Sequence, residues 1–258
     1  MDLDLKGKTA LVTGSYRGTG LIIAQTLIEE GVNTLVHGLK APQAEKAVTE
    51  LGGGIAITAD ITTQEGCEEL VELANEYSLD IIVNNYGTAD PNSWKEGDSG
   101  PWFGAYEKNV LSAQRITQGL LPALLKKKWG RVINLGTTGS TKPSRKNPAY
   151  YSAKGALVAM TVSLAGELAN TGVTANIVSP GLILTPEVKQ QLVDQSAKKK
   201  EKATWEDIEA RVAKDIPIGR IVRREEVANI IAFLCSPKAD AIHGQNIKVD
   251  GGALGIVS

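Results

Sequence analysis

Tyr150 and Lys154 are the two side chains of this sequence whose types and spacing best suit proton transfer. They are four residues apart in a segment of helical pattern, so they share one face of the expected helix. A free tyrosine has a pKa near ~10, and a neighbouring ammonium group favours the phenolate and lowers that pKa. Such a phenol can exchange a proton with an oxygen atom of a bound molecule. Because Tyr-x-x-x-Lys is also common in purely structural helices, the pair needs a second signal.

The glycine-rich stretch Thr13–Gly20, with the sequence TGSYRGTG, is that second signal. It follows the apolar run 9–12, expected as a buried strand, and precedes residues 21–28, expected as an amphipathic helix. Glycines let the backbone approach a ligand closely, and a helix N-terminus offers unpaired N–H groups to an anion. The spacing is G-x3-G-x-G rather than the commoner G-x-G-x-x-G, and it predicts a phosphate site.

Strand and helix patterns alternate along the chain and must position these residues. Strands are expected at 8–13, 32–37, 54–59, 80–84, 130–136, 173–179 and 245–249, and helices at 18–30, 42–51, 64–77, 102–127, 147–171 and 224–235. This alternation predicts right-handed βαβ units. The expected fold class is α/β, a single Rossmann-type doubly wound domain over residues 1–258, with about seven parallel strands and helices on both faces. Residues 184–217 are expected to form a substrate lid.

Polar and glycine residues gather where three of the expected strands end. These stretches are residues 84–87 (NNYG), 134–139 (NLGTTG) and 179–185 (SPGLILT). Ligands of open α/β sheets bind at the carboxyl ends of the strands. The three stretches therefore predict one shared crevice, although each could be ordinary turn chemistry.

Composition narrows the class of protein. The 258 residues are 42% hydrophobic and 22% charged, and the net charge of −1 gives no general attraction to nucleic acid or to an anionic membrane. No apolar run approaches the ~20 residues of a membrane span, and the N-terminus lacks a signal-peptide pattern. Cys67 and Cys235 form no disulfide framework, which favours a cytoplasmic location. His37 and His243 show no ligand spacing, so we expect no metal site.

Taken together, these motifs resemble the short-chain dehydrogenase/reductase family, and most of all its 3-oxoacyl-[acyl-carrier-protein] reductases. The resemblance covers residues 8 to 252. The matching residues are Thr13–Gly20, Asp60, Asn84-Asn85-x-Gly87, Asn109, Tyr150-x-x-x-Lys154, Pro180-Gly181-x-Ile183-x-Thr185 and Val249-Asp250-Gly251-Gly252.

The resemblance implies roles for these residues around a nicotinamide cofactor. It implies Tyr150 as the acid/base and Lys154 as the residue that binds the nicotinamide ribose and lowers the tyrosine pKa, while Asn109 holds a water of the proton relay. The diphosphate and adenosine end of the cofactor would be held by Gly14, Arg17, Gly18 and Thr19, and the adenine would be flanked by Asp60 and Ile61. The ribose would lie near Asn85 and Gly87. The nicotinamide would be positioned by Pro180, Gly181, Ile183 and Thr185. A homotetramer is also implied.

Two positions depart from the family pattern. Thr137 stands thirteen residues before Tyr150, where the family usually has serine. Its hydroxyl can still donate to a substrate carbonyl, but its methyl group stiffens the side chain and narrows the pocket. Thr138 is the alternative donor. Tyr86 replaces the usual alanine, and its ring is expected to crowd the cofactor or line the substrate pocket, or else to point into a side cavity.

The end of the second strand bears on the choice of cofactor. Relatives that prefer NAD usually carry an acidic residue there, whereas this chain has His37-Gly38-Leu39-Lys40. Arg17 and Lys40 could instead meet a 2′-phosphate, to which the geometry of arginine is well suited. We therefore expect a preference for NADP(H), with NAD(H) possible.

The substrate is expected to be a small-molecule carbonyl or alcohol, bound between residues 88–101, which include Trp94, and residues 139–148. Two groups of basic residues suggest a carboxylate, a phosphate or acyl carrier protein as the partner, or they are simply exposed charge. The groups are Lys142, Arg145 and Lys146, and Lys126, Lys127, Lys128 and Arg131. The sequence predicts an NADP-dependent carbonyl reductase or alcohol dehydrogenase. The alternatives are an NAD-linked sugar, polyol or hydroxy-acid dehydrogenase and a catalytically silent nucleotide-sensing protein.

Overall fold

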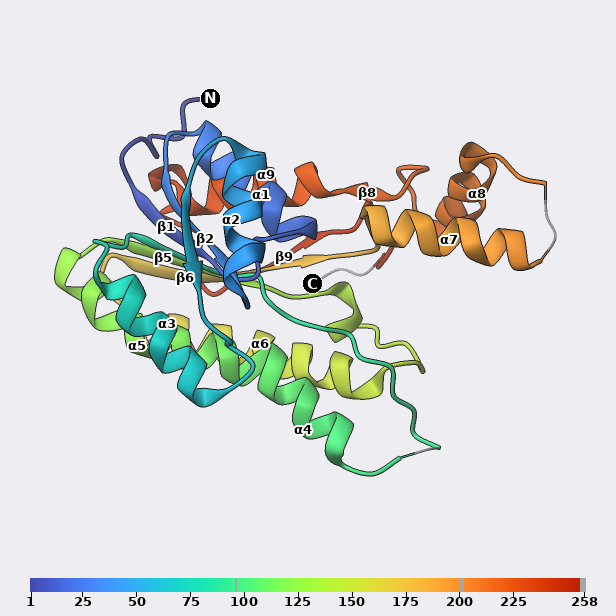
Figure 1. The fold of residues 1–258 in the computed structure, drawn as a ribbon, viewed down its shortest axis with the longest axis horizontal. Coiled ribbons are helices and arrows are strands. Elements are labelled where there is room, and N and C mark those ends of the chain that lie inside the picture. The colour runs from blue at the N-terminus through green and yellow to red at the C-terminus, as the bar shows by residue number, and fades with distance from the viewer. Residues whose placement is uncertain (96, 200–201, 256–258) are drawn as a thin grey trace.

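A seven-stranded parallel sheet runs through the computed structural model, which describes residues 1–95, 97–199 and 202–255 (Figure 1). Its strand order is β3-β2-β1-β4-β5-β6-β9. The strands are β1 (Thr9–Val12), β2 (Asn33–Gly38), β3 (Ile55–Thr58), β4 (Ile81–Asn84), β5 (Gly130–Leu135), β6 (Val173–Pro180) and β9 (Asn246–Val249). All seven expected strands are present and every pairing in the sheet is parallel, so the predicted fold class is confirmed.

Helices cover both faces of this sheet (Figure 1). On one face lie α1 (Gly18–Glu29) and α9 (Arg224–Cys235), and on the other lie α3 (Gln64–Asn75), α5 (Ser112–Lys127) and α6 (Pro148–Glu167). Alternate residues of one strand enter different cores: Val12 packs on the α1–α9 side and Leu11 on the α3–α5 side. Both are apolar because both faces are covered. Helix α2 (Ala41–Leu51) packs beside β2 and β3.

The two cysteines belong to these two cores. Cys67 on α3 lies in one hydrophobic cluster and Cys235 on α9 in the other, and both are free and buried. Burial raises the pKa of the Cys235 thiol to about 12, so it packs as a neutral side chain. The structure also shows no helix, within its described residues, that is long and apolar enough to cross a membrane.

The segment expected as one helix at 102–127 is divided in the structure. Helix α4 (Gly100–Tyr106) leads into a π-helical turn, Glu107–Leu111, before α5 begins. A π turn inserts an extra residue into the helical ladder, and such turns are frequent at functional sites. This one carries Asn109. Short 3₁₀ turns occur at Thr138–Ser140, Ala213–Asp215 and Pro237–Ala239.

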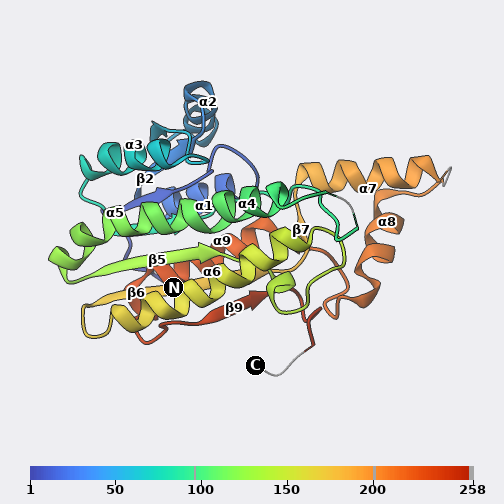
Figure 2. The same cartoon turned by 90° about the horizontal axis from the view of Figure 1, so that it is seen from below.

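Helices α7 (Pro186–Lys198) and α8 (Trp205–Val212) project beyond the carboxyl ends of the strands (Figures 1 and 2). Two short strands that the sequence reading did not include, β7 (Ile183–Leu184) and β8 (Val222–Arg223), pair in parallel at the base of this projection. An ion pair of 2.8 Å between Arg223 and Glu209 ties α8 to β8. The pairing of β7 with β8 therefore joins the two chain segments that flank α7 and α8.

Candidate active site

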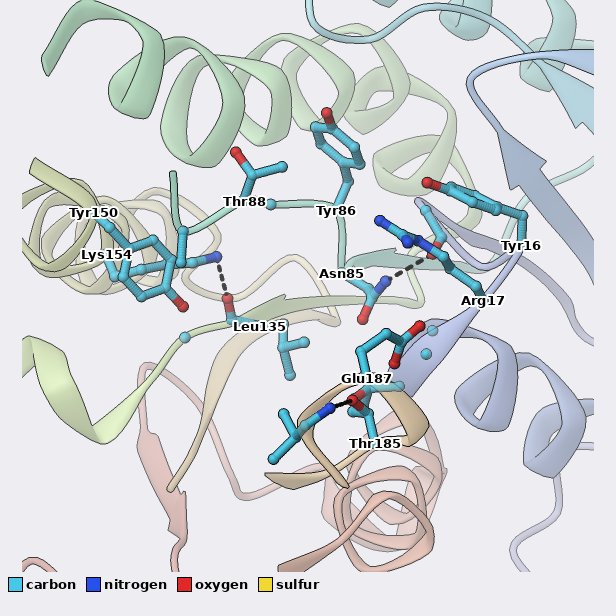
Figure 3. A pocket seen from close by; sticks show the side chains of 18 of the residues that line it. Tyr16, Arg17, Asn85, Tyr86, Thr88, Leu135, Tyr150, Lys154, Thr185 and Glu187 are labelled. Carbon is cyan, nitrogen blue, oxygen red and sulfur yellow. Dashed lines mark hydrogen bonds between the residues drawn. The ribbon is translucent and has the colours of Figure 1, made fainter. Parts of the chain in front are cut away.

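A cavity of about 640 Å³ lies at the carboxyl ends of the central strands (Figure 3). The glycine turn, the ends of β4 and β5, and the first turns of α6 and α7 all contribute to it. Ten of the residues expected in the site line this one cavity: Gly14, Arg17, Gly18, Thr19, Asn85, Tyr86, Gly87, Tyr150, Lys154 and Thr185. The crevice predicted from the three strand ends is thus formed.

The glycine turn is held in place by a network of buried hydrogen bonds. Gly14 has a φ of +62°, and its N–H donates to Nδ1 of His37 at 3.0 Å. Asn85 Nδ2 donates to the carbonyl oxygens of Thr13 at 2.9 Å and Gly14 at 3.2 Å. A side chain at Gly20 would collide with Asn85, so this position must be glycine. No described side chain caps α1, which leaves the N–H groups of its first turn available to an anion.

His37 is a core residue that shapes this turn rather than a ligand. It is fully buried, Nδ1 accepts the Gly14 N–H, and Nε2 lies 3.0 Å from the carbonyl oxygen of Ala59. This arrangement fits only the neutral ring with its proton on Nε2, since a second proton on Nδ1 would face the Gly14 N–H. Burial accordingly lowers the pKa of His37 to about 4.

We expect this histidine to make the protein less stable in acid. Its pKa is about 4 in the folded state against 6.5 ordinarily, so the unfolded chain binds the proton more readily as the pH falls below 6.5. Between pH 7.5 and pH 5 the free energy of unfolding should drop by about 2 kcal/mol through His37. Urea unfolding at both pH values would measure this. The drop in the free energy of unfolding should be smaller by about 2 kcal/mol in His37→Gln and unchanged in His243→Gln. An equal drop in the parent protein and in both variants would show that His37 does not cause it.

Lys154 and Tyr150 extend from α6 into the cavity. Lys154 is 3% exposed, and its Nζ donates to the carbonyl oxygen of Leu135 at 2.7 Å. Burial lowers its pKa to about 8. Burial, together with the neighbouring Tyr151, raises the pKa of Tyr150 to about 12, while a hydrogen bond with Thr137 acts in the opposite direction.

The pKa of Tyr150 is therefore raised rather than lowered in this structure, and the expected effect of Lys154 on that pKa stays a prediction. The lysine ammonium is directed to the end of β5, and the loss of water around the phenol outweighs other effects. At neutral pH the phenol keeps its proton and is ready to donate it.

Thr137 follows β5 and is the threonine that reaches Tyr150. Its side chain is hydrogen-bonded to the phenol, and its Oγ1 also accepts the N–H of Gly139 at 3.2 Å. Thr138 begins the adjoining 3₁₀ turn, where its carbonyl oxygen accepts the N–H groups of Thr141 and Lys142. The geometry thus favours Thr137 as the hydroxyl beside the phenol.

Asn109 lies behind the cavity wall with one unused acceptor. It is 1% exposed, and its Nδ2 donates to the carbonyl oxygens of Thr88 and Ala105, both at 2.9 Å. Its Oδ1 has no hydrogen-bond partner among the described residues. A Cβ atom at Gly87 would collide with this Oδ1 and lie 3.1 Å from Lys154 Nζ. Gly87 therefore leaves room for a small hydrogen-bonding group between the asparagine and the lysine.

Asn92 is a positioning contact that sequence reasoning did not single out. Its Oδ1 accepts the N–H of Ala149 at 3.1 Å, and its carbonyl oxygen accepts the N–H of Asn147 at 3.2 Å. Asn147, the residue before α6, has a φ of +55° and makes no side-chain cap of its own to that helix. The loop after β4 therefore caps the helix that carries Tyr150.

The structure places Tyr86 and Trp94 away from Tyr150. A Cβ atom at Gly14 would lie 3.2 Å from the Tyr86 ring, which puts that ring at the glycine-turn end of the cavity (Figure 3). Burial raises the pKa of Tyr86 to about 12. Trp94 is 76% exposed, stacks on Trp102 with ring centroids 5.0 Å apart, and is not part of the cavity wall. Of the two, only Tyr86 lines the cavity, at the end where the cofactor rather than the substrate is expected.

Nine other expected site residues are not on the wall of the cavity. They are Lys40, Asp60, Ile61, Asn109, Thr137, Thr138, Pro180, Gly181 and Ile183. Lys40 is exposed at the start of α2, and Ile61 is buried in the core. Tyr16, Thr88, Leu135, Gly136 and Glu187 also line the cavity; they fall within segments expected at the site but were given no individual role. The described residues include no group of three or more His, Cys, Asp or Glu able to hold a metal ion.

Two of the four residues in the basic cluster near residue 128 are paired with acidic residues, while Lys126 and Lys128 are exposed. Arg131 is fully buried and hydrogen-bonded to Asp240, and its guanidinium lies over the Trp129 ring at 4.4 Å. Lys127 pairs with Asp80 at 2.8 Å. Both residues lie near the amino end of β5, whereas the cavity lies at the carboxyl ends of the strands.

These features define a class of protein. A doubly wound parallel sheet with a glycine turn after its first strand and a Tyr–Lys pair on the helix after its fifth is the arrangement of a short-chain dehydrogenase/reductase. The chain matches the family model described as enoyl-(acyl carrier protein) reductase over residues 14–253. It belongs to the short-chain dehydrogenase/reductase family and is an oxidoreductase of the kind that acts on CH–OH groups.

Individual relatives cover nearly all of the chain or all of it. The 3-oxoacyl-[acyl-carrier-protein] reductase FabG of Haemophilus influenzae is 33% identical, with 96% of this chain and 98% of the relative covered. D-beta-hydroxybutyrate dehydrogenase of Cupriavidus necator is 35% identical, with coverage of 96% and 98%. The crystal structure of L-sorbose reductase from Gluconobacter frateurii, complexed with NADPH and L-sorbose, superposes with a TM-score of 0.93 at 30% identity and covers 100% of both chains.

Proposed function

We propose that this protein is an NADP-dependent oxidoreductase that transfers a hydride between nicotinamide and a ketone or secondary alcohol, in the manner of a 3-oxoacyl-[acyl-carrier-protein] reductase. One observation carries the proposal: the phenol of Tyr150 and the buried ammonium group of Lys154 line the same cavity as a glycine-rich helix start. A silent nucleotide-sensing protein would need the helix start but not the phenol, the buried lysine and the unused asparagine oxygen.

The cavity fits a nicotinamide dinucleotide. The first turn of α1 offers N–H groups to the diphosphate, and a side chain at Gly18 would meet nothing within 4 Å, so the turn is open to a ligand. Lys154 and the free Oδ1 of Asn109 face the space beside Gly87, where ribose hydroxyls and a water can be held. Thr185 lines the cavity and would help to position the nicotinamide. When bound, the nicotinamide supplies or accepts the hydride.

The side chains supply binding and the proton. Thr137 holds the carbonyl oxygen of the substrate by a hydrogen bond, and Tyr150 donates its proton to that oxygen as negative charge develops on it. Lys154 stabilises the phenolate that remains, and a water held by Asn109 Oδ1 returns the proton to the phenol. In the oxidative direction the same groups act in reverse.

Cofactor preference follows from the charges near the glycine turn. Arg17 lines the cavity and no acidic residue ends β2, so a 2′-phosphate would meet a cation there. We expect NADPH to bind more tightly than NADH, and Arg17→Ala to reduce the difference. Calorimetric titration of both cofactors would measure it. Arg145→Ala, which removes an exposed charge elsewhere, is the control. Tighter NADH binding by the parent protein would reverse the preference.

The substrate class is proposed from the surface that adjoins the site. Lys142, Arg145 and Lys146 are exposed in the segment between Thr137 and α6, where they can attract the phosphate of a carrier-linked 3-oxoacyl group. The β-hydroxybutyrate dehydrogenase relative supports a 3-hydroxy acid as the alternative, and L-sorbose reductase supports a keto sugar. These three substrate classes can be distinguished by turnover rates with a 3-oxoacyl thioester, acetoacetate and L-sorbose, each measured with NADPH and with NADH. We further propose that residues 184–217 close over the substrate.

A further inference from the structure

Glu187 brings an acidic side chain into the wall of the proposed cofactor cavity. It stands in the first turn of α7, two residues after Thr185, which caps that helix by accepting the N–H of Val188 at 3.2 Å. The cavity wall includes Glu187 together with Arg17 and Gly18 of the glycine turn. Figure 3 shows the Glu187 side chain extending from its helix toward the side of the cavity where Arg17 lies.

A second depression, of about 510 Å³, adjoins the first, and its wall contains Glu187 and other charged residues. The charged residues of its wall are Arg17, Lys46, Glu50, Glu187 and Arg224. Arg224 is directed at the glycine turn, since its Nη1 lies 3.4 Å from the carbonyl oxygen of Gly18. Hydrogen bonds from its own backbone N–H and from Thr185, with smaller contributions from Arg17 and Arg224, hold the pKa of Glu187 below its ordinary value. The carboxylate is therefore charged at neutral pH and sits among these cations.

We propose that Glu187 is a specificity-determining residue, which competes with the 2′-phosphate of the cofactor for Arg17 and so weakens the binding of NADPH relative to NADH. The proposal rests on the proposed function, because it assumes that the cavity binds a nicotinamide dinucleotide. A dianionic phosphate brought to Arg17 meets a second anion already attracted to that guanidinium. NADH has no phosphate at that position, so its binding is affected less.

The test is the cofactor affinity of Glu187→Gln, measured by calorimetry in the intact protein. Removing the charge should tighten NADPH binding about two- to fivefold, the range for charges at exposed sites, and should change NADH binding less. The gain should decline as salt is added. Asp194→Asn is the matched control, since it removes the same charge two turns further along α7, where the side chain pairs with Gln190 instead. It should leave both affinities unchanged.

A double-mutant cycle identifies the partner. In an Arg17→Ala background, Glu187→Gln should no longer tighten NADPH binding. A gain that persists without Arg17, a gain that is equal for NADPH and NADH, or no gain at all would each overturn the competition proposal while leaving the proposed function in place. Failure of the parent protein to bind either cofactor would instead reject the proposed function and the inference with it.

Discussion

Replacing Tyr150 with phenylalanine should remove nearly all turnover while leaving the fold and cofactor binding intact. Only the phenol oxygen is lost, and the ring keeps its packing on Tyr151, whose centroid lies 5.2 Å away. A positioned acid or base contributes about 10²- to 10⁴-fold to rate, so kcat should fall by that amount. Steady-state rates on one accepted ketone, with calorimetry for the cofactor, would show whether chemistry and binding separate in this way.

Tyr151 provides the matched control for this experiment. It is the adjacent phenol on the same helix, and it lies against Gly139, where an added side chain would collide with its ring. Tyr151→Phe should therefore reduce kcat far less than Tyr150→Phe. If Tyr150→Phe retained turnover within a few-fold of the parent and Tyr151→Phe did not, the proton donor would be Tyr151.

The pKa of Tyr150 adds a pH dependence to the same assignment. Burial raises it to about 12, so the phenol stays protonated throughout the neutral range and donation to a ketone needs no prior titration. Oxidation of an alcohol needs the phenolate, whose population rises with pH up to that value. The oxidative rate should therefore continue to rise above pH 8, whereas the reductive rate should not increase there.

Most of the fold was predictable because its signals are local. Most strands of the sheet contain a short apolar run, and glycine or polar clusters mark the carboxyl ends of several of them. The division between α4 and α5 was not predictable, since residues 102–127 keep a helical pattern through the π turn that carries Asn109. Strands β7 and β8 have two residues each and exist only because the chain returns to pair them.

The site was predictable where a motif fixes it and not where distant segments meet. The Asn92 cap of α6 joins residues 57 apart, and neither end shows a motif. Arg131 resembled a surface charge in the sequence, but Asp240 lies 109 residues away and holds it inside. Whether the pKa of Tyr150 is raised or lowered depends on how much water reaches the phenol. The spacing of Tyr150 and Lys154 in the sequence does not determine that.

Catalysis should depend on the hydroxyl group of Thr137 more than on its methyl group. Thr137→Ala removes the hydrogen bond beside Tyr150 and leaves the developing oxyanion without a preorganised partner, a loss of order 10²-fold in kcat at comparable sites. Thr137→Ser keeps the hydroxyl and removes the methyl that narrows the pocket, so activity should hold or rise. Thr138→Ala should be milder, because the contacts that the structure shows for Thr138 are made by its backbone carbonyl.

Steady-state rates of the three variants on one accepted ketone decide between the two threonines. The contact between Thr137 and the phenol is what distinguishes them in the structure. A greater loss in Thr138→Ala would make Thr138 the donor and would show that the hydroxyl beside the phenol is not the one that holds the carbonyl. If neither alanine variant lost activity, the carbonyl would be held by Tyr150 alone. Neither threonine would then take the catalytic role of the serine that is usual in the family.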